Sequence, residues 1–379
     1  MRSKMRGIRI AWLSMLSINL TNAWTPSRGM PMKFSQANTI SSPTQLWNVP
    51  PPSENSVVEF KQYASKLPPP SSFFELQQDC QRAVRLARKD GHKLLEVEFP
   101  PLPAAVLEMD DVSAYDVVQA NLKLALDFSK GLLAGERDGS SLKKIALLFP
   151  DQAEADFAVE KAGSINPYPG VVISSLLSSE GIDDRYFKPE QIFLNLLGKR
   201  EGSVKPVPDT DLYIILTASA QELPDVEALH KQEPDKTIVF FNLKLDVLRG
   251  DFGAPAFPKK EFQDRFLSRV KPVYYLRTRQ YTRSTPKPPF MVNFQGCLFR
   301  AYPGQYQTLL DTGTGRYRRL VGSDIRPALG AFKEQLTDDL KSQGILDDEG
   351  STLSFLRTGY KTTTWWEEER PEASQEWLT

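Results

Sequence analysis

The most constraining feature of this sequence is a short, fully apolar run near its middle, from Ile238 to Phe241, which Thr237 precedes and Asn242 follows. An apolar run of this length, with no alternating polar residues, predicts a strand that is buried on both faces of a sheet. In open α/β sheets, the residues that follow such strands lie where ligands tend to bind. The run therefore predicts a central parallel strand, extending over residues 237–245, and makes Asn242 a candidate site residue.

Similar apolar runs recur before it, separated by stretches with helical spacing. Strands are expected at residues 93–99, 144–149, 171–174 and 211–216. Helices are expected from a capping box at Ser72 and Glu75 to Gly91, and at residues 114–128, 152–162, 190–197 and 219–230. Strands that alternate with helices form right-handed βαβ units and a parallel sheet. The fold class is thus a three-layer α/β domain with a mainly parallel, Rossmann-like sheet and helices on both faces.

The pattern changes after residue 245. A short helix is expected near residues 262–270, a strand at 272–276, and a surface loop from Arg277 to Pro289. One or two antiparallel or edge strands follow at Met291–Tyr302, and the apolar stripe of Leu329, Phe332, Leu336 and Leu340 predicts a last helix. The expected organisation is a presequence at 1–56, a proline-rich linker at 57–70, one α/β domain at 71–310, and a C-terminal helix with an acidic tail at 311–379. The tail contains three tryptophans, Trp365, Trp366 and Trp377, which either pack on the folded domain or contact a partner.

The first segment resembles a targeting sequence. No acidic residue precedes Glu54, and the apolar stretch Ile10–Leu20 suits a signal-peptide core but is too short to span a bilayer. Residues 24–53, rich in Ser, Thr, Asn and Pro with sparse basic charge, resemble a transit peptide. The two parts together predict import into a plastid of the kind that algae acquired secondarily. The alternative is a secretory signal followed by a linker. No transmembrane helix is expected in the mature chain.

Composition narrows the range of functions. Lys and Arg balance Asp and Glu at 47 each, so no global field favours nucleic acid or membrane. The two cysteines, Cys80 and Cys297, are predicted to be buried thiols, and His92 and His230 are expected to be exposed or to cap helices. No metal-ligand spacing, phosphate-binding glycine motif or nucleophile motif is found, so no metal site is predicted and the sequence names no cofactor or catalytic residue.

The predicted strand ends supply the best candidate ligand site. The residues that follow these strands and would line one rim of the sheet are Asp151, Thr217, Ser219, Asn242 and Asp246. They offer hydrogen-bonding groups and two carboxylates to a cation or to a polar ligand, such as a nucleotide or a phosphorylated metabolite. The alternative is that these side chains cap helices and form turns.

A basic stretch with interleaved tyrosines, Lys259 to Lys287, is a second candidate surface. The residues proposed to bind a partner or an anion are Arg269, Arg277, Arg279, Arg283 and Arg300. Arginine and tyrosine together can hold single-stranded RNA, although nucleic acid is the less favoured partner; an anionic lipid surface or an acidic protein loop would also fit. The alternative is a solvated loop that balances acidic surface elsewhere.

Several segments, taken in order, carry a family resemblance. They are DLYIIL at 211–216, FFNLKL at 240–245, DRFL at 264–267, YYL at 274–276 and LFRAYP at 298–303. Over about residues 70–310 this order resembles an uncharacterised plastid domain family, found in the plant protein named for low photosystem II accumulation and at the end of a chloroplast adenylate kinase. Leu243 and Tyr306 depart from the Pro and Trp that the family often has.

The resemblance implies a location in the plastid stroma or on the stromal face of the thylakoid. It also implies a non-enzymatic role in photosystem II assembly, with thylakoid or photosystem assembly proteins as partners. Peripheral contact with the membrane surface is expected from the basic stretch, not from the resemblance. No catalytic activity is implied.

Overall fold

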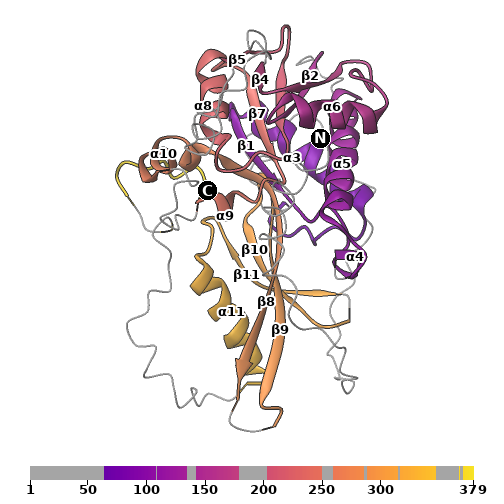
Figure 1. The fold of residues 1–379 in the computed structure, drawn as a ribbon. Helices are drawn as coiled ribbons and strands as arrows, with labels where there is room; N and C mark the ends of the chain where they lie inside the picture. The colour runs from indigo at the N-terminus through magenta and orange to yellow at the C-terminus, as the bar shows by residue number, and fades with distance from the viewer. Residues whose placement is uncertain are drawn as a thin grey trace, which may run out of the picture.

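The computed structural model describes most of the chain from Ala64 onward (Figure 1). The described residues are 64–107, 109–134, 142–178, 203–249, 259–285, 288–314, 316–346, 367 and 370–379. Within them the main sheet has nine strands in the order β11-β10-β9-β8-β1-β7-β6-β2-β3, and β4 and β5 form a separate two-stranded sheet. The helix expected at residues 190–197 lies outside the described part.

The predicted parallel strands are all present. They are β1 (Leu94–Glu98), β2 (Ile145–Phe149), β3 (Val171–Ser175), β6 (Leu212–Ile215) and β7 (Thr237–Phe241). Parallel pairing joins β3, β2, β6, β7, β1 and the first half of β8. Every residue of β7 is buried, as its continuous apolar sequence predicts for a strand covered on both faces.

Helices cover both faces of this parallel half, so the three-layer expectation is confirmed. The helices α3 (Phe73–Lys89), α5 (Ala114–Ala134) and α6 (Gln152–Ala162) pack in one apolar cluster with alternate residues of the strands. The opposite cluster contains α8 (Leu223–Gln232), α10 (Lys260–Arg265) and the 3-10 turn η2 (Leu267–Arg269). Ser72 caps α3 by accepting the Glu75 amide at 3.2 Å. Short elements complete this half: α4 (Ala104–Leu107), β4 (Leu177–Ser178), β5 (Ser203–Val204) and α9 (Leu245–Arg249).

Strand β7 ends earlier than its composition predicts. Asn242 and Lys244 both have φ near +54°, a left-handed conformation that no strand sustains, and α9 begins at Leu245. The prediction of a strand reaching Leu245 is therefore wrong. Two left-handed residues turn the chain sharply at the carboxyl end of the sheet, which sets Asn242 and Asp246 on different sides of the turn.

The antiparallel half is larger than expected. It contains β8 (Lys271–Ser284), β9 (Met291–Ala301), β10 (Tyr306–Asp311) and β11 (Tyr317–Ser323). The surface loop predicted from Arg277 to Pro289 is wrong over most of its length, because β8 continues to Ser284 and pairs with β9 from Tyr274↔Ala301 to Ser284↔Met291. Cross-strand pairing with β9 holds these polar and basic residues in a strand that local propensity did not indicate.

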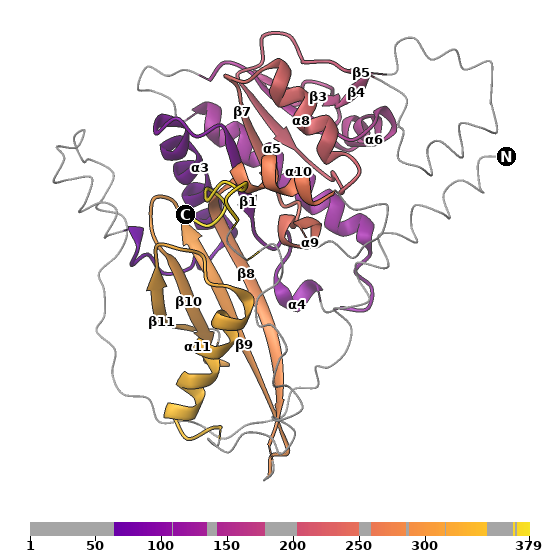
Figure 2. The same cartoon turned by 90° about the vertical axis from the view of Figure 1, so that its left-hand side faces the viewer.

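The distal halves of β8 and β9 form an arm, here defined as residues 277–285 and 288–298, which extends beyond the helical layers (Figures 1 and 2). Helix α11 (Leu329–Ser342) packs along one face of this extension, and its Phe332, Leu336 and Leu340 are buried there. Gly296 lies directly beneath Leu336, since a Cβ at this position would approach a Leu336 methyl to 2.5 Å. The helix therefore sits close against the arm.

The C-terminal region belongs to the same sheet and core. The expected domain boundary after residue 310 falls within β10, one residue before this strand ends at Asp311. Strand β11 pairs with β10, and α11 completes the core of this half. Trp377 packs back on the body: it is 5% exposed and its amide donates to Ser268 O at 3.1 Å. Both cysteines are buried free thiols, as predicted. Within the described residues, no helix is long and apolar enough to cross a bilayer.

Candidate functional site

Asn242 holds together the ends of two neighbouring strands and a helix. Its side-chain carbonyl accepts the Phe99 amide at 2.9 Å, and its side-chain amide donates to Asn121 of α5 at 2.8 Å. Its own backbone amide donates to Val97 of β1 at 2.8 Å. These bonds link the carboxyl ends of β1 and β7, on the side of the sheet where α/β proteins bind their ligands. Both polar ends of the Asn242 side chain thus bond to the protein itself.

The next strand ends along the rim also bond to residues of the chain. Asp151 caps α6 by accepting the Glu154 amide at 3.0 Å, and the Thr217 hydroxyl donates to the Glu154 carboxylate at 2.7 Å. Ser219 donates its backbone amide to Glu222 at 2.6 Å, within the turn that opens α8. The structure therefore brings Asp151 and Thr217 together at the ends of β2 and β6, but it does not join them to Asn242.

Asp246 takes part in a different and more deeply buried arrangement. Its Oδ2 accepts a hydrogen bond from the Tyr275 hydroxyl at 2.6 Å and one from Arg277 at 3.1 Å. Arg326 bonds to the same oxygen, and Arg279 lies 3.5 Å from it. Three guanidinium groups and a phenol thus surround one carboxylate whose side chain is 4% exposed. Sequence reasoning had assigned Asp246, Arg277 and Arg279 to two separate surfaces, and the fold joins them.

Two glutamates of β1 lie beside this group. Glu96 and Glu98 are 1% and 6% exposed, and Glu98 is the register partner of Tyr275 on β8. The Glu98 carboxylate accepts the backbone amide of Lys244 at 2.9 Å, which ties it to the turn that follows β7. We refer to Glu96, Glu98, Asp246, Tyr275, Arg277, Arg279 and Arg326 as the junction cluster, because it lies where the parallel and antiparallel halves of the sheet meet.

The junction cluster perturbs the acidity of its members. Burial raises the pKa of Glu98 to about 7, and the opposing attraction of Arg277 does not offset this effect. Burial also raises the pKa of the Tyr275 hydroxyl, which therefore stays protonated and donates to Asp246. Taking several charges out of water costs several kcal/mol per ion before their attraction is counted, so apolar residues would fill this junction at least as favourably. Such clusters are candidate functional sites for this reason, and Glu98 is a group able to exchange a proton near neutral pH.

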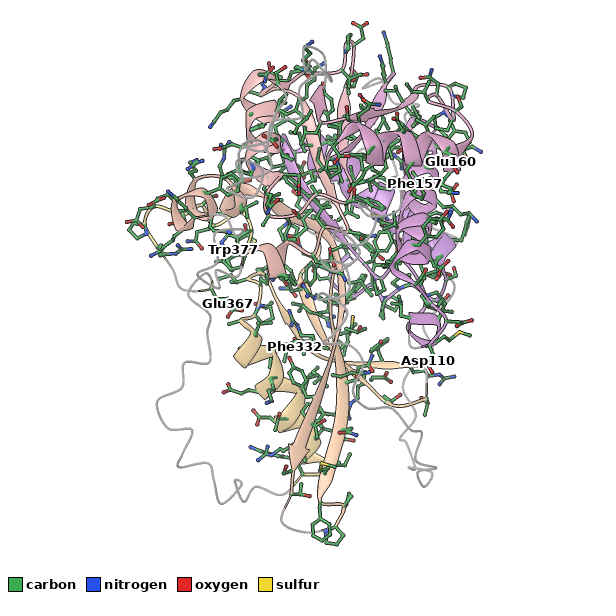
Figure 3. The ribbon with its side chains drawn as sticks, viewed as in Figure 1. Asp110, Phe157, Glu160, Phe332, Glu367 and Trp377 are labelled. Atoms are coloured by element: carbon green, nitrogen blue, oxygen red, sulfur yellow. The ribbon has the colours of Figure 1, made fainter. Side chains whose placement is uncertain are left out.

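The C-terminal segment closes over one side of the cluster. The Arg326 guanidinium stacks on the Tyr275 ring at 4.4 Å and lies 5.9 Å from the Trp377 ring, while its backbone amide donates to Leu378 O at 2.8 Å. A hollow of about 20 Å³ between Arg326, Glu367 and Trp377 has room for about one water molecule. Trp377 and Glu367 lie beside the upper end of α11, and Phe332 lies between that helix and the arm (Figure 3). Asp246 and Arg326 are consequently enclosed by protein, whereas the side chains of Arg277 and Arg279 remain 21% and 23% exposed.

The other predicted arginines are dispersed. Arg269 is exposed on η2, and Arg283 lies toward the far end of the arm. Arg300 is 5% exposed: its Nε donates to Gly304 O at 3.2 Å and its guanidinium stacks on Tyr306 at 4.6 Å. Elsewhere in the basic stretch, Arg265 forms two 2.9 Å bonds with Glu227. The described residues of this stretch, 259–285, therefore divide their arginines among separate contacts.

The histidines and a surface groove lie away from the junction cluster. His230 lies in the last turn of α8, near the helix end as expected, but it is 8% exposed and therefore not a surface residue. Burial lowers its pKa, and burial likewise lowers the pKa of His92. A shallow groove of about 470 Å³ runs along the amino ends of β2 and β3, beside Lys143, Lys144 and Tyr168. In the described part of the chain, no group of His, Cys, Asp and Glu side chains is arranged to hold a metal ion.

Sequence reasoning missed Glu96, Glu98, Tyr275 and Arg326 as members of one site. The two glutamates did carry a signal, because charged residues inside an otherwise buried strand are rarely left without a role. Arg326 carried none: it precedes Pro327 in a segment without periodicity, and only the folding of that segment onto the sheet brings it to Asp246.

The fold and site together define an α/β protein whose mainly parallel sheet continues into an antiparallel extension, with a buried charge cluster at the junction. The chain belongs to the family described as "domain of unknown function (DUF1995)", whose model matches residues 70–334. This match confirms an uncharacterised domain family over most of the folded chain. Comparison with curated proteins and with solved structures gives no match.

Replacing Asn242 by alanine is expected to lower the free energy of unfolding by about 2 kcal/mol, because the Phe99 amide loses its acceptor in a buried site and alanine tolerates a left-handed φ poorly. Urea denaturation measures the loss. Asn166→Ala is the matched control, since Asn166 is exposed and does not have the left-handed φ of Asn242. An alanine variant as stable as the native chain would contradict the assigned structural role.

Proposed function

We propose that this chain is a plastid biogenesis factor that acts by binding other proteins, with photosystem II assembly as the process that the family resemblance implies. The observation that supports the binding role is that the polar side chains at the strand ends bond to residues of the same chain. Asn242, Asp151 and Thr217 lie where an α/β enzyme holds its substrate, and they bond instead to Phe99, Asn121 and Glu154 of the same chain. The arm offers a separate element with which to contact a partner.

The plastid setting rests on the leader and on the family resemblance. The leader lacks acidic residues before Glu54 and joins a short apolar stretch to a segment rich in Ser, Thr, Asn and Pro. A fusion of residues 1–56 to a fluorescent protein tests this part of the proposal in an alga with a secondary plastid. Fluorescence in the plastid supports it, whereas fluorescence confined to the secretory pathway would identify a plain secretory signal.

The binding role predicts a specific set of companions. The tagged full chain, expressed in such an alga and recovered from detergent-solubilised plastids, is expected to bring down thylakoid or photosystem assembly proteins. A tagged stromal protein of unrelated fold serves as the control for abundant contaminants. Enrichment of nothing beyond the stromal enzymes that the control also recovers would contradict the proposal.

The alternative is a sensor or enzyme for a nucleotide or phosphorylated metabolite. The topology favours a ligand site at the carboxyl ends of the neighbouring strands β2 and β6. The helices that follow these strands, α6 and α8, lie on opposite faces of the sheet, and α/β proteins usually bind ligands between two such strands. A ligand at a hundred times its dissociation constant stabilises a protein by about 2.7 kcal/mol. A thermal-shift screen with nucleotides and sugar phosphates therefore decides between the two functions, and a shift that Thr217→Val abolishes would favour the ligand site.

A further inference from the structure

The far end of the arm combines exposed apolar side chains with an absence of carboxylates. Phe290 and Met291 are 64% and 65% exposed, and the neighbouring Pro288 and Pro289 are exposed as well. Large apolar side chains at the apex of a hairpin contribute nothing to the core behind them, so their exposure calls for a contact outside the chain. We define the arm tip as residues 284–285 and 288–291.

The charge along this part of the chain has a single sign. The sequence contains no Asp or Glu between Asp264 and Asp311, and therefore none in β8, in β9 or in the turn between them. At the base of the arm, Arg277 and Arg279 are paired with Asp246. Arg283 lies beyond this pairing, one register position before Ser284, where β8 ends. The surplus positive charge of the arm is thus at the same end as the exposed apolar side chains.

We infer that the arm tip docks on an anionic membrane surface, with Phe290 and Met291 entering the headgroup region and Arg283 attracted to acidic lipid headgroups. Apolar side chains flanked by basic residues are the combination that holds a protein on such a surface. The inference deepens the proposed function, on which it rests for its setting, by naming the surface that the arm meets.

The size of the tip favours a membrane over an acidic protein. A stable protein interface buries about 800 Å² on each partner, which a narrow hairpin apex does not offer without its flanks. The flanks of this hairpin are polar on one face, where Thr282 bonds to Asn293 and Gln280 to Gln295, and α11 covers part of the other. A lipid surface needs only the apex, because affinity there depends on how deep a few side chains enter.

The test places a fluorescent probe at the tip of the full chain. Cys80 and Cys297 are 0% and 1% exposed, so a Met291→Cys variant offers an accessible thiol for an environment-sensitive dye such as NBD. Mixed with vesicles of equal parts phosphatidylcholine and phosphatidylglycerol, the labelled protein is expected to show a blue shift and a rise in emission. Pure phosphatidylcholine vesicles should give about a tenfold weaker response, and added salt should weaken the response to the anionic vesicles.

Two controls make the result specific to the tip. The same dye on an Ile165→Cys variant, at a site 54% exposed that precedes β3, should not respond, even if the leader itself binds lipid. Adding Phe290→Ser to the Met291→Cys variant should weaken the response about tenfold, and it removes no buried contact, so the thermal midpoint should stay unchanged.

The vesicle experiment and the plastid pull-down can fail independently, so failure of the inference can be distinguished from failure of the proposed function. No change at residue 291 with anionic vesicles, or an equal change at residue 165, would contradict tip docking, while the plastid pull-down could still succeed. A dye response at residue 291 to a recovered assembly protein, without any response to vesicles, would likewise overturn the lipid contact and identify a protein partner. A lipid response together with an empty pull-down would contradict the assembly role alone.

Discussion

Removing the Asp246 carboxylate is expected to lower the free energy of unfolding by about 3–5 kcal/mol, the usual cost of leaving a buried charge without its partner. In an Asp246→Ala variant, Arg326 keeps a guanidinium that is 5% exposed and loses its counter-charge, and Arg277 and Arg279 lose theirs. The Tyr275 hydroxyl loses its acceptor as well. Urea or guanidinium denaturation, followed by circular dichroism, measures the difference.

Two further variants identify the cause of this loss. Adding Arg326→Met to Asp246→Ala should recover part of the stability, because the most deeply buried unpaired charge is then gone. Asp338→Ala is the matched control: its side chain is 70% exposed and pairs with Lys341 on the surface of α11, so its removal should change stability by no more than about 0.5 kcal/mol. If Asp246→Ala and Asp338→Ala unfold at the same denaturant concentration, the junction cluster does not hold the two halves of the sheet together.

The protonation of Glu98 should give the fold an unusual dependence on pH. Burial raises the pKa of this carboxyl to about 7 in the folded protein, against a model-peptide value of 4.5. Between these values the folded state holds a proton that the unfolded chain has released. The contribution of this group to stability is therefore complete below about pH 4.5 and is lost as the pH rises through about 7.

A Glu98→Gln variant isolates this contribution, because the amide oxygen still accepts the Lys244 amide and carries no charge. Between pH 5 and pH 8 the stability of the variant relative to the native chain is expected to rise by about 2–3 kcal/mol. The charged groups that act on Glu98, namely Arg277, Glu96 and Asp246, are the same in both proteins, so their own pH dependence cancels in the comparison.

The control for this experiment is Glu160→Gln on α6, a glutamate whose side chain is 71% exposed (Figure 3). Its stability relative to the native chain should stay constant within about 0.5 kcal/mol over the same pH range. A Glu98→Gln variant that tracks the native chain from pH 5 to pH 8 would show that Glu98 is ionised in the folded protein at neutral pH and that burial does not control it.

Local patterns predicted the parallel half well because each element there carries its own signal. Helix α6 begins and ends where the Asp151 cap and Gly163 indicate, and Gly163 adopts the left-handed conformation that ends a helix. Strands β2, β6 and β7 are continuous apolar runs, and every residue in them is buried, because a strand that is apolar on both faces must be covered on both faces. Fold class and strand positions followed from these runs.

The antiparallel half was predicted less well because its strands depend on partners. The segment from Arg277 to Ser284 is basic and polar, and it is a strand only because β9 pairs with it residue by residue. Strand β11 pairs with β10 alone at the edge of the sheet, and its residues are half-buried or exposed, so it lacks the apolar alternation that would have marked it.

The same distinction applies to the candidate site. The sequence by itself determined the central strand, the class of fold and the residues that lie at the strand ends, because hydrophobic periodicity and helix caps are local properties. Only the tertiary structure decided what those residues meet. The Asn242 side chain bonds to Phe99 and Asn121. Asp246 binds arginines that lie 31, 33 and 80 positions further along the chain. Charges so distant in sequence are brought together by strand pairing and by the packing of the C-terminal segment, and no local pattern encodes either contact.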